Sequence, residues 1–248
     1  MKKSSRNHWR NLWVFGDSYT TPYECVNPRE SFWGKLAECA DIPTIVNCSR
    51  RKNSFDSVMQ LVIGLHQQFD LERDVLLIGV PPLERITVFD MFKDTPYKAL
   101  EFNTASWQEQ ELDILCHRSL ISLHGHERPS NVVVNNFRTY TEVDAMRKIF
   151  LLTQWLDQLA AHYIIVNLEA PWDKNNRWPP SEFLLDYCLS HQRCILFDNT
   201  YRGINIGINR PKDFDLHGWA GHHGPDGNQH FFSHSLWPKF VELELESQ

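Results

Sequence analysis

The amino-acid sequence predicts an α/β fold in which helices cover both faces of a parallel sheet. Short apolar runs alternate with segments of helical spacing, five such steps follow one another, and the apolar runs are continuous. A continuous run is typical of a parallel strand, because both of its faces are buried. The length of 248 residues suits one large domain, which we expect to occupy residues 1–248.

The expected strands are the five apolar runs. The clearest is the run 75–79, which reads Val-Leu-Leu-Ile-Gly. The five strands are expected at residues 12–15, 44–47, 75–79, 163–167 and 194–197. Connections between parallel strands are right-handed, so we expect a doubly wound sheet with its functional site beyond the carboxyl ends of the strands.

The expected helices lie between and after these strands. In residues 54–69, apolar side chains recur at the spacing of one helix face. The helices are expected at residues 31–40, 54–69, 142–161, 180–190 and 229–243. Pro238 should kink or interrupt the last helix, because proline has no N–H and its ring clashes with the preceding turn.

Residues 81–140 have no clear periodicity and are too long for a plain connection. We expect an insertion at about residues 83–140, on the site side of the sheet, that serves as a lid, a substrate wall or a partner surface. The sequence His124-Gly125-His126 within it has no third ligand nearby in the sequence, so we interpret it as a solvated loop and not as a metal site.

The composition excludes several classes of protein. A net charge of −6 argues against a nucleic-acid binder, which needs a basic face. No run approaches the roughly 18 apolar residues of a membrane helix, and the first residues lack the apolar core of a secretion signal. The six cysteines form no C-x-x-C pair, so we expect reduced thiols in a cytoplasmic or virion-associated protein.

The strongest functional motif is Gly16-Asp17-Ser18, directly after the first expected strand. A turn at this place presents Ser18 just past the carboxyl end of a strand. A nucleophilic serine needs this placement, because its hydroxyl must reach the substrate and its N–H can stabilise an oxyanion. A polar turn with only local hydrogen bonds is the other interpretation of the motif.

This block resembles the SGNH/GDSL hydrolase superfamily, whose members carry their serine in a Gly-Asp-Ser block after the first strand. The resemblance implies a flavodoxin-like three-layer sandwich with a five-stranded parallel sheet and an insertion after strand 3. It also implies an esterase, lipase or carbohydrate deacetylase that uses neither a metal nor another cofactor. Only the first family block matches this chain well.

The second family block supplies a glycine whose N–H enters the oxyanion hole. Here the glycine position falls near Lys52, in the loop after the second expected strand. By the resemblance, Lys52 and Asn53 are the oxyanion-binding candidates of this loop. The basic run from Arg50 to Lys52 is either a solvated loop or a cationic rim that attracts an anionic substrate.

The third family block carries an asparagine that donates to the oxyanion, and Pro81 stands in its place. Three interpretations follow. Arg85 donates instead, or Asn135 or Asn136 does so from the insertion, or catalysis has been lost. Arg85 can also be a structural partner of a nearby carboxylate, Glu84 or Asp90.

The last family block holds the general base and its acid before the final helix. His222 and His223 both fit the base position, and the acid is absent from its usual place three residues earlier. Asp215 is the first substitute, followed by Asp213 and Asp226, because the base needs a partner that fixes its tautomer. The further histidines could form a metal cluster but fit surface positions better. They are His217, His230 and His234.

Two functions from different classes remain open at this stage. The first is a serine hydrolase that cleaves carboxylic esters, such as O-acetyl groups on carbohydrate, on a small-molecule or glycan substrate. The second is a catalytically degenerate binding or virion structural module with a protein assembly partner. The altered blocks resemble SGNH-like proteins of tailed bacteriophages. The nine tryptophans either fill the core or offer stacking surfaces for sugars.

Overall fold

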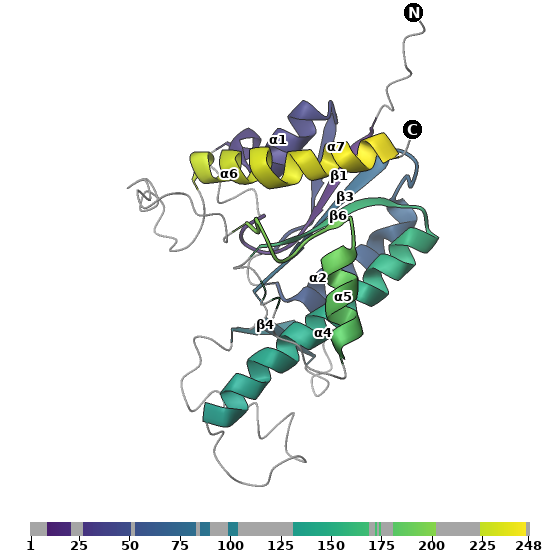
Figure 1. The fold of residues 1–248 in the computed structure, drawn as a ribbon. Coiled ribbons are helices and arrows are strands. Elements are labelled where there is room, and N and C mark those ends of the chain that lie inside the picture. Colours follow the sequence, from purple (N-terminus) through teal and green to yellow (C-terminus); the bar gives the residue numbers. More distant parts are fainter. Residues whose placement is uncertain are drawn as a thin grey trace, which may run out of the picture.

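The computed structural model is an α/β structure in which one sheet lies between two layers of helices (Figure 1). It describes residues 9–20, 27–50, 53–82, 85–89, 99–103, 131–168, 172, 174, 181–201 and 224–246. Residues outside these ranges are not described below.

The central sheet has five parallel strands in the order β2-β1-β3-β6-β7. Its strands are β1 (Asn11–Phe15), β2 (Thr44–Asn47), β3 (Asp74–Val80), β6 (His162–Asn167) and β7 (Cys194–Ile195). Counted along the chain, the parallel strands follow the order 2-1-3-4-5, which is flavodoxin-like. The predicted fold class is therefore confirmed by the strand order of the sheet itself.

Helices cover both faces of this sheet (Figure 1). On one face lie α1 (Phe32–Cys39), α6 (Pro225–Phe231) and α7 (Trp237–Glu246). On the other face lie α2 (Phe55–Leu65), α4 (Asn131–Gln158) and α5 (Glu182–Ser190). Serine side chains cap two of the helices, since Ser31 accepts the N–H of Gly34 and Ser54 accepts that of Ser57.

Alternating side chains of each strand enter the two cores. In β1, Trp13 and Phe15 pack toward α2, α4 and α5, whereas Leu12 and Val14 pack toward α1, α6 and α7. This alternation explains the continuous apolar runs, because a strand between two helical layers needs apolar side chains on both faces.

Asp74 joins the amino-terminal ends of β1 and β3. Its carboxylate is buried and accepts hydrogen bonds from the Asn11 amide at 2.8 Å, the Trp13 indole at 2.7 Å and the Asp70 N–H at 3.0 Å. These three hydrogen bonds replace the hydrogen bonds to water that the carboxylate loses when it is buried. Asp74 thus fixes the edge of the sheet at which its strands begin.

The expectation of an irregular stretch through residue 140 is wrong at two places. β4 (Arg85–Phe89) and β5 (Ala99–Asn103) form a separate antiparallel pair, and β4 contacts α2. α4 begins at Asn131, well before the expected start. The sequence obscured this start, because the run Val132-Val133-Val134 is β-branched and disfavours a helix in isolation.

The last two elements also differ from expectation. β7 ends at Ile195, because the carbonyl of Leu196 accepts hydrogen bonds from the Asn167 amide and from the Trp172 N–H. The final helix begins earlier than expected, and a π-helical segment, Phe232–Leu236, separates α6 from α7 just before Pro238. This wider turn accommodates a proline, which has no N–H for the regular ladder.

Replacing Asp74 by alanine should lower the free energy of unfolding by about 3 kcal/mol, because buried donors of Asn11 and Trp13 lose a charged acceptor. Urea unfolding measures the change. Glu38→Ala, which removes an exposed carboxylate of α1, is the matched control and should stay within about 0.5 kcal/mol of wild type. A similarly small change for Asp74→Ala would contradict this role.

Candidate active site

The turn after β1 places Ser18 at the carboxyl edge of the sheet. Asp17 Oδ1 accepts the N–H of Tyr19 at 3.1 Å, and the Asp17 carbonyl accepts both the N–H of Thr20 at 3.1 Å and its hydroxyl at 2.9 Å. Asp17 is fully buried, and Ser18 is 7 % exposed. Asp17 therefore shapes the turn, and the hydroxyl of Ser18 belongs to a largely covered side chain.

Gly16 is required by this turn. Its φ is +158°, and a Cβ at this position would lie 2.4 Å from Thr20 Oγ1. Thr20 Oγ1 is itself held by the Asp17 carbonyl, so it cannot move away without losing that bond. Glycine in the motif is thus explained by the close approach of the Thr20 side chain.

Asn53 holds the same turn from the neighbouring loop. Its Nδ2 donates to the carbonyl of Gly16 at 2.9 Å, and the backbone N–H of Arg50 donates to that carbonyl at 3.3 Å. The backbone N–H of Asn53 donates to the Arg50 carbonyl at 3.3 Å. The second N–H of the Asn53 amide makes no hydrogen bond with a described residue.

Asn47 makes a parallel contact at the end of β2. Its Nδ2 donates to the carbonyl of Thr20 at 2.7 Å, and its Oδ1 accepts the N–H of Ser49 at 2.9 Å. Two asparagines, Asn47 at the end of β2 and Asn53 before α2, thus hold both ends of the turn that carries Ser18. The role of Asn47 was not predicted from the sequence.

The end of β3 offers no side-chain donor. Pro81 and Pro82 follow β3 and are buried. A Cβ on Gly79 would lie 2.5 Å from Leu168 Cδ1, so β3 and the segment after β6 approach closely here. Among the described residues directly after β3, Pro81 and Pro82 thus provide no hydrogen-bond donor, and which group replaces the asparagine stays a prediction.

Tyr201, which the sequence did not single out, links the Ser18 turn to the opposite end of the chain. Its ring lies 5.6 Å from that of Tyr19 and 5.5 Å from that of Phe231, measured between centroids. Its N–H donates to the Asn167 carbonyl at 3.0 Å. An aromatic side chain in an irregular segment gives no sequence signal for such a contact.

Several residues named from the sequence lie outside the described part of the chain. They are Lys52, Glu84, Asp90, His124, Gly125, His126, Asp213, Asp215, His217, His222 and His223. Arg85 begins β4, Asn135 and Asn136 belong to α4, and Asp226 is exposed in the first turn of α6. The convergence of Ser18 with an imidazole therefore stays a prediction.

Cys48 is the other nucleophilic group close to this turn. Its N–H donates to the Val14 carbonyl at 2.8 Å. Burial raises the pKa of the Cys48 thiol, and the charge of Arg50 only partly opposes that rise. Burial therefore disfavours the reactive thiolate form of Cys48.

The described histidines give no metal cluster. His230 and His234 stack with ring centroids 4.0 Å apart, but within the described ranges no three His, Cys, Asp or Glu side chains gather as a metal site would require. Among the helices that the structure describes, none is long and apolar enough to cross a membrane.

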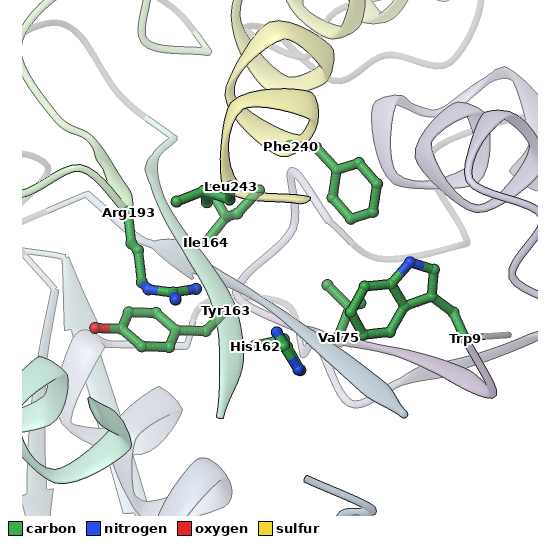
Figure 2. Close-up of a pocket in the computed structure, with 8 residues that line it drawn as sticks. All are labelled: Trp9, Val75, His162, Tyr163, Ile164, Arg193, Phe240 and Leu243. Atoms are coloured by element: carbon green, nitrogen blue, oxygen red, sulfur yellow. The ribbon is translucent and has the colours of Figure 1, made fainter. Parts of the chain in front are cut away.

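A small hollow lies at the other edge of the sheet, where the strands begin (Figure 2). Trp9, His162 and Arg193 line it together with apolar side chains. Arg193 lies over the ring of Tyr163 at 5.1 Å, and Trp9 meets His162 edge to face at 4.8 Å. The hollow is therefore separate from the Ser18 turn.

The described tryptophans serve the core. Trp9, Trp13, Trp33 and Trp172 are buried, and Trp155 and Trp237 pack against the two core clusters. The core interpretation of the tryptophan content is therefore the correct one for these positions.

Comparisons with known proteins add three solved structures. A putative lipolytic protein of the G-D-S-L family from Desulfitobacterium hafniense is similar at a TM-score of 0.43 and 11 % identity, over 90 % of this chain and 95 % of that chain. The psychrotrophic esterase EstA from Pseudoalteromonas sp., inhibited by monoethylphosphonate, is similar at a TM-score of 0.43 and 8 % identity, over 94 % of this chain and 98 % of that chain. A member of the lipolytic protein G-D-S-L family from Veillonella parvula is similar at a TM-score of 0.41 and 13 % identity, over 92 % of this chain and 97 % of that chain.

No protein-family model matches the sequence, and no curated protein matches it either.

The stability of the fold should decrease as the pH falls below about 6.5, the ordinary histidine pKa. Burial lowers the pKa values of His162 and His191, and Arg193 adds to the effect at both, whereas Asp157 partly opposes it at His191. The unfolded chain then binds protons that the folded chain excludes, so unfolding is favoured in acid. Urea unfolding at pH 7.5 and pH 5.5 measures the loss. The loss should be smaller in His162→Gln, and an equal loss in this variant would contradict the assignment.

Proposed function

We propose that this chain is a serine hydrolase of the SGNH/GDSL type that cleaves carboxylic esters, with Ser18 as the nucleophile. The observation that carries the proposal is the turn at the carboxyl edge, where Gly16, Asp17 and Asn53 fix the position of Ser18. Catalytic groups are expected at this edge of a doubly wound sheet. A simple polar turn would not need a second loop to hold it.

In the proposed reaction, His222 or His223 removes the proton of the Ser18 hydroxyl as Oγ attacks the ester carbonyl. The alcohol leaves with that proton, and water then hydrolyses the acyl-enzyme with the same histidine as base. Asp215 is the proposed partner of the histidine, with Asp213 and Asp226 as the alternatives. The carboxylate fixes the tautomer and stabilises the imidazolium.

The oxyanion would be stabilised by donors other than the usual asparagine. The N–H groups of Ser18 and Lys52 are two candidates. Asn53 is a third, because its amide already points one N–H at the Gly16 carbonyl. Arg85 is the remaining candidate, on the strand that follows Pro81 and Pro82. Loss of one oxyanion donor costs on the order of 10²–10³ in rate, so a replacement matters for turnover.

The proposed substrate carries a small acyl group, such as acetyl, on a polar or carbohydrate scaffold. The described surroundings of the Ser18 turn are polar, with Asn47 and Asn53 next to it. Arg50 is exposed beside the turn, and no described carboxylate pairs with it. A long lipid chain would find little apolar surface among these side chains.

The buried Pro81 favours a second function, a binding module without catalysis. Proline has neither a side-chain donor nor an N–H, so the third donor of the family is absent from this strand end. In that case the domain would act in assembly, for example in the virion of a tailed bacteriophage. The same origin fits a cytoplasmic or virion-associated location.

A fluorophosphonate probe should label the wild-type protein and should fail to label Ser18→Ala, because the probe reacts only with an activated nucleophile. Mass spectrometry of the labelled peptide checks the position. Ser190→Ala, which changes an exposed serine at the end of α5, should label like wild type. Absence of labelling in the wild type between pH 6 and pH 9 would support the binding module.

Acetyl esters should be hydrolysed with a kcat/KM at least about tenfold above that of long-chain esters, because the polar site gains little from added methylenes. Initial rates with p-nitrophenyl acetate and p-nitrophenyl decanoate measure the ratio. A faster reaction with the decanoate would overturn the proposed preference while leaving Ser18 as the nucleophile.

A further inference from the structure

Two histidines of the last helical segment stack on one another. His230 lies near the end of α6, and His234 lies four residues later, in the π-helical segment Phe232–Leu236. Their ring centroids are 4.0 Å apart, and the ring planes are inclined by 25°. His230 is half-buried, and His234 is exposed. The reaction proposed above uses neither ring, so the pair has no role in it.

A hydrogen bond fixes the tautomer of His234. Its Nδ1 lies 3.0 Å from the carbonyl oxygen of His230. A carbonyl oxygen only accepts, so Nδ1 carries the proton of the neutral ring and Nε2 keeps its lone pair for a further ligand. Histidines that bind metals in proteins almost always donate their other ring N–H to a carbonyl, a carboxylate or water, and His234 has this arrangement.

The distance between the two rings suits a single metal ion. Zn²⁺ binds imidazole nitrogen at about 2.0–2.1 Å, so two nitrogens on one tetrahedral ion are about 3.4 Å apart. The ring centroids are already 4.0 Å apart, and a small rotation of the His230 ring is sufficient to bring one nitrogen of each ring to that distance. This ring makes no hydrogen bond with a described residue, so the rotation breaks none.

The residues around the pair place no positive charge next to it. Residues 224–238 contain one carboxylate, that of Asp226, and neither lysine nor arginine. The adjacent polar side chains bond to each other, since Gln229 Nε2 donates to Ser233 Oγ at 2.8 Å and Ser233 Oγ donates to the Gln229 carbonyl at 2.6 Å. A cation therefore meets the two imidazoles without repulsion from this segment.

We propose that His230 and His234 form a surface chelate site for a divalent transition-metal ion, for which Zn²⁺ is the probe. Imidazole nitrogen is a ligand that suits zinc, copper and nickel. The pair supplies two ligands and water completes the coordination, in agreement with the lack of a three-ligand cluster among the described residues. The bound ion joins α6 to the π-helical segment before Pro238. The site is independent of the proposed function, because Ser18 takes no part in it.

Zinc should protect both histidines from diethylpyrocarbonate, a reagent that modifies accessible imidazole nitrogens. The whole chain is treated with the reagent at pH 7 across a zinc titration, and peptide mass spectrometry measures the modification of each histidine. Modification of His230 and of His234 should fall together, with one zinc midpoint, because one ion engages both rings. Equal modification of the two rings with and without millimolar zinc would overturn the proposal.

The variant His234→Gln removes one of the two ligands. The zinc midpoint for protection of His230 should then rise at least about 10-fold, because a single imidazole loses the effective concentration that the second one provides. His230→Gln should have the same effect on the protection of His234. Neither side chain is part of the buried core, so both variants should keep the fold. An unchanged midpoint in these variants would assign protection to single histidines and contradict the chelate.

His66 provides the control within the same chain. Its Nδ1 lies 2.6 Å from the carbonyl oxygen of Ile63, so its tautomer is fixed like that of His234, but its described ring neighbour is Trp155, at 5.7 Å. Protection of His66 should need at least about 10-fold more zinc than protection of the pair. His66→Gln should leave the midpoints of His230 and His234 unchanged. Protection of all three rings at one zinc concentration would show binding to single imidazoles and would also overturn the proposal.

Discussion

The carbonyl of Gly16 is the point on which the candidate site depends. It lies two residues before Ser18 and accepts hydrogen bonds from the Asn53 amide and from the Arg50 N–H. A carbonyl held by two donors cannot rotate, so the peptide plane after Gly16 is fixed and the direction of the chain into Ser18 follows from it. The φ of +158° at Gly16 and the contact with Thr20 leave no room for another residue.

The two edges of the sheet are held by different chemistry. At the edge where strands begin, the carboxylate of Asp74 collects donors from β1 and from the turn before β3. At the edge where strands end, four asparagine amides each donate to a backbone carbonyl. They are Asn47 to Thr20, Asn53 to Gly16, Asn167 to Leu196 and Asn228 to Gly224. An amide carries no net charge, so these side chains hold the backbone segments without adding a charge to the electrostatic field at this edge.

The central strands could be predicted from the sequence, because burial on both faces leaves a continuous apolar run in β1, β3 and β6. β2 is more exposed and β7 has only two residues, so their runs are weaker signals. The position of Ser18 follows from the end of β1. The start of α4 was missed because Val132-Val133-Val134 disfavours a helix locally and only tertiary packing can offset this. The contact between Phe32 and Asn228 joins residues 196 positions apart, and no local pattern encodes such a separation.

Pro81 stands where the resembled family carries an asparagine donor, and neither Pro81 nor Pro82 has a donor of its own. In the proposed reaction an oxyanion beside Ser18 would draw on another group, and one candidate is Asn53 in the loop after β2, whose amide is already held by the Gly16 carbonyl. The two N–H bonds of an amide are coplanar, so the bond to Gly16 also sets the direction of the second one. A donor that is fixed before the reaction needs no reorganisation as charge develops, which is the property that makes such groups effective. In the proposed reaction, Asn53 would therefore both hold the turn that carries Ser18 and stabilise the tetrahedral intermediate.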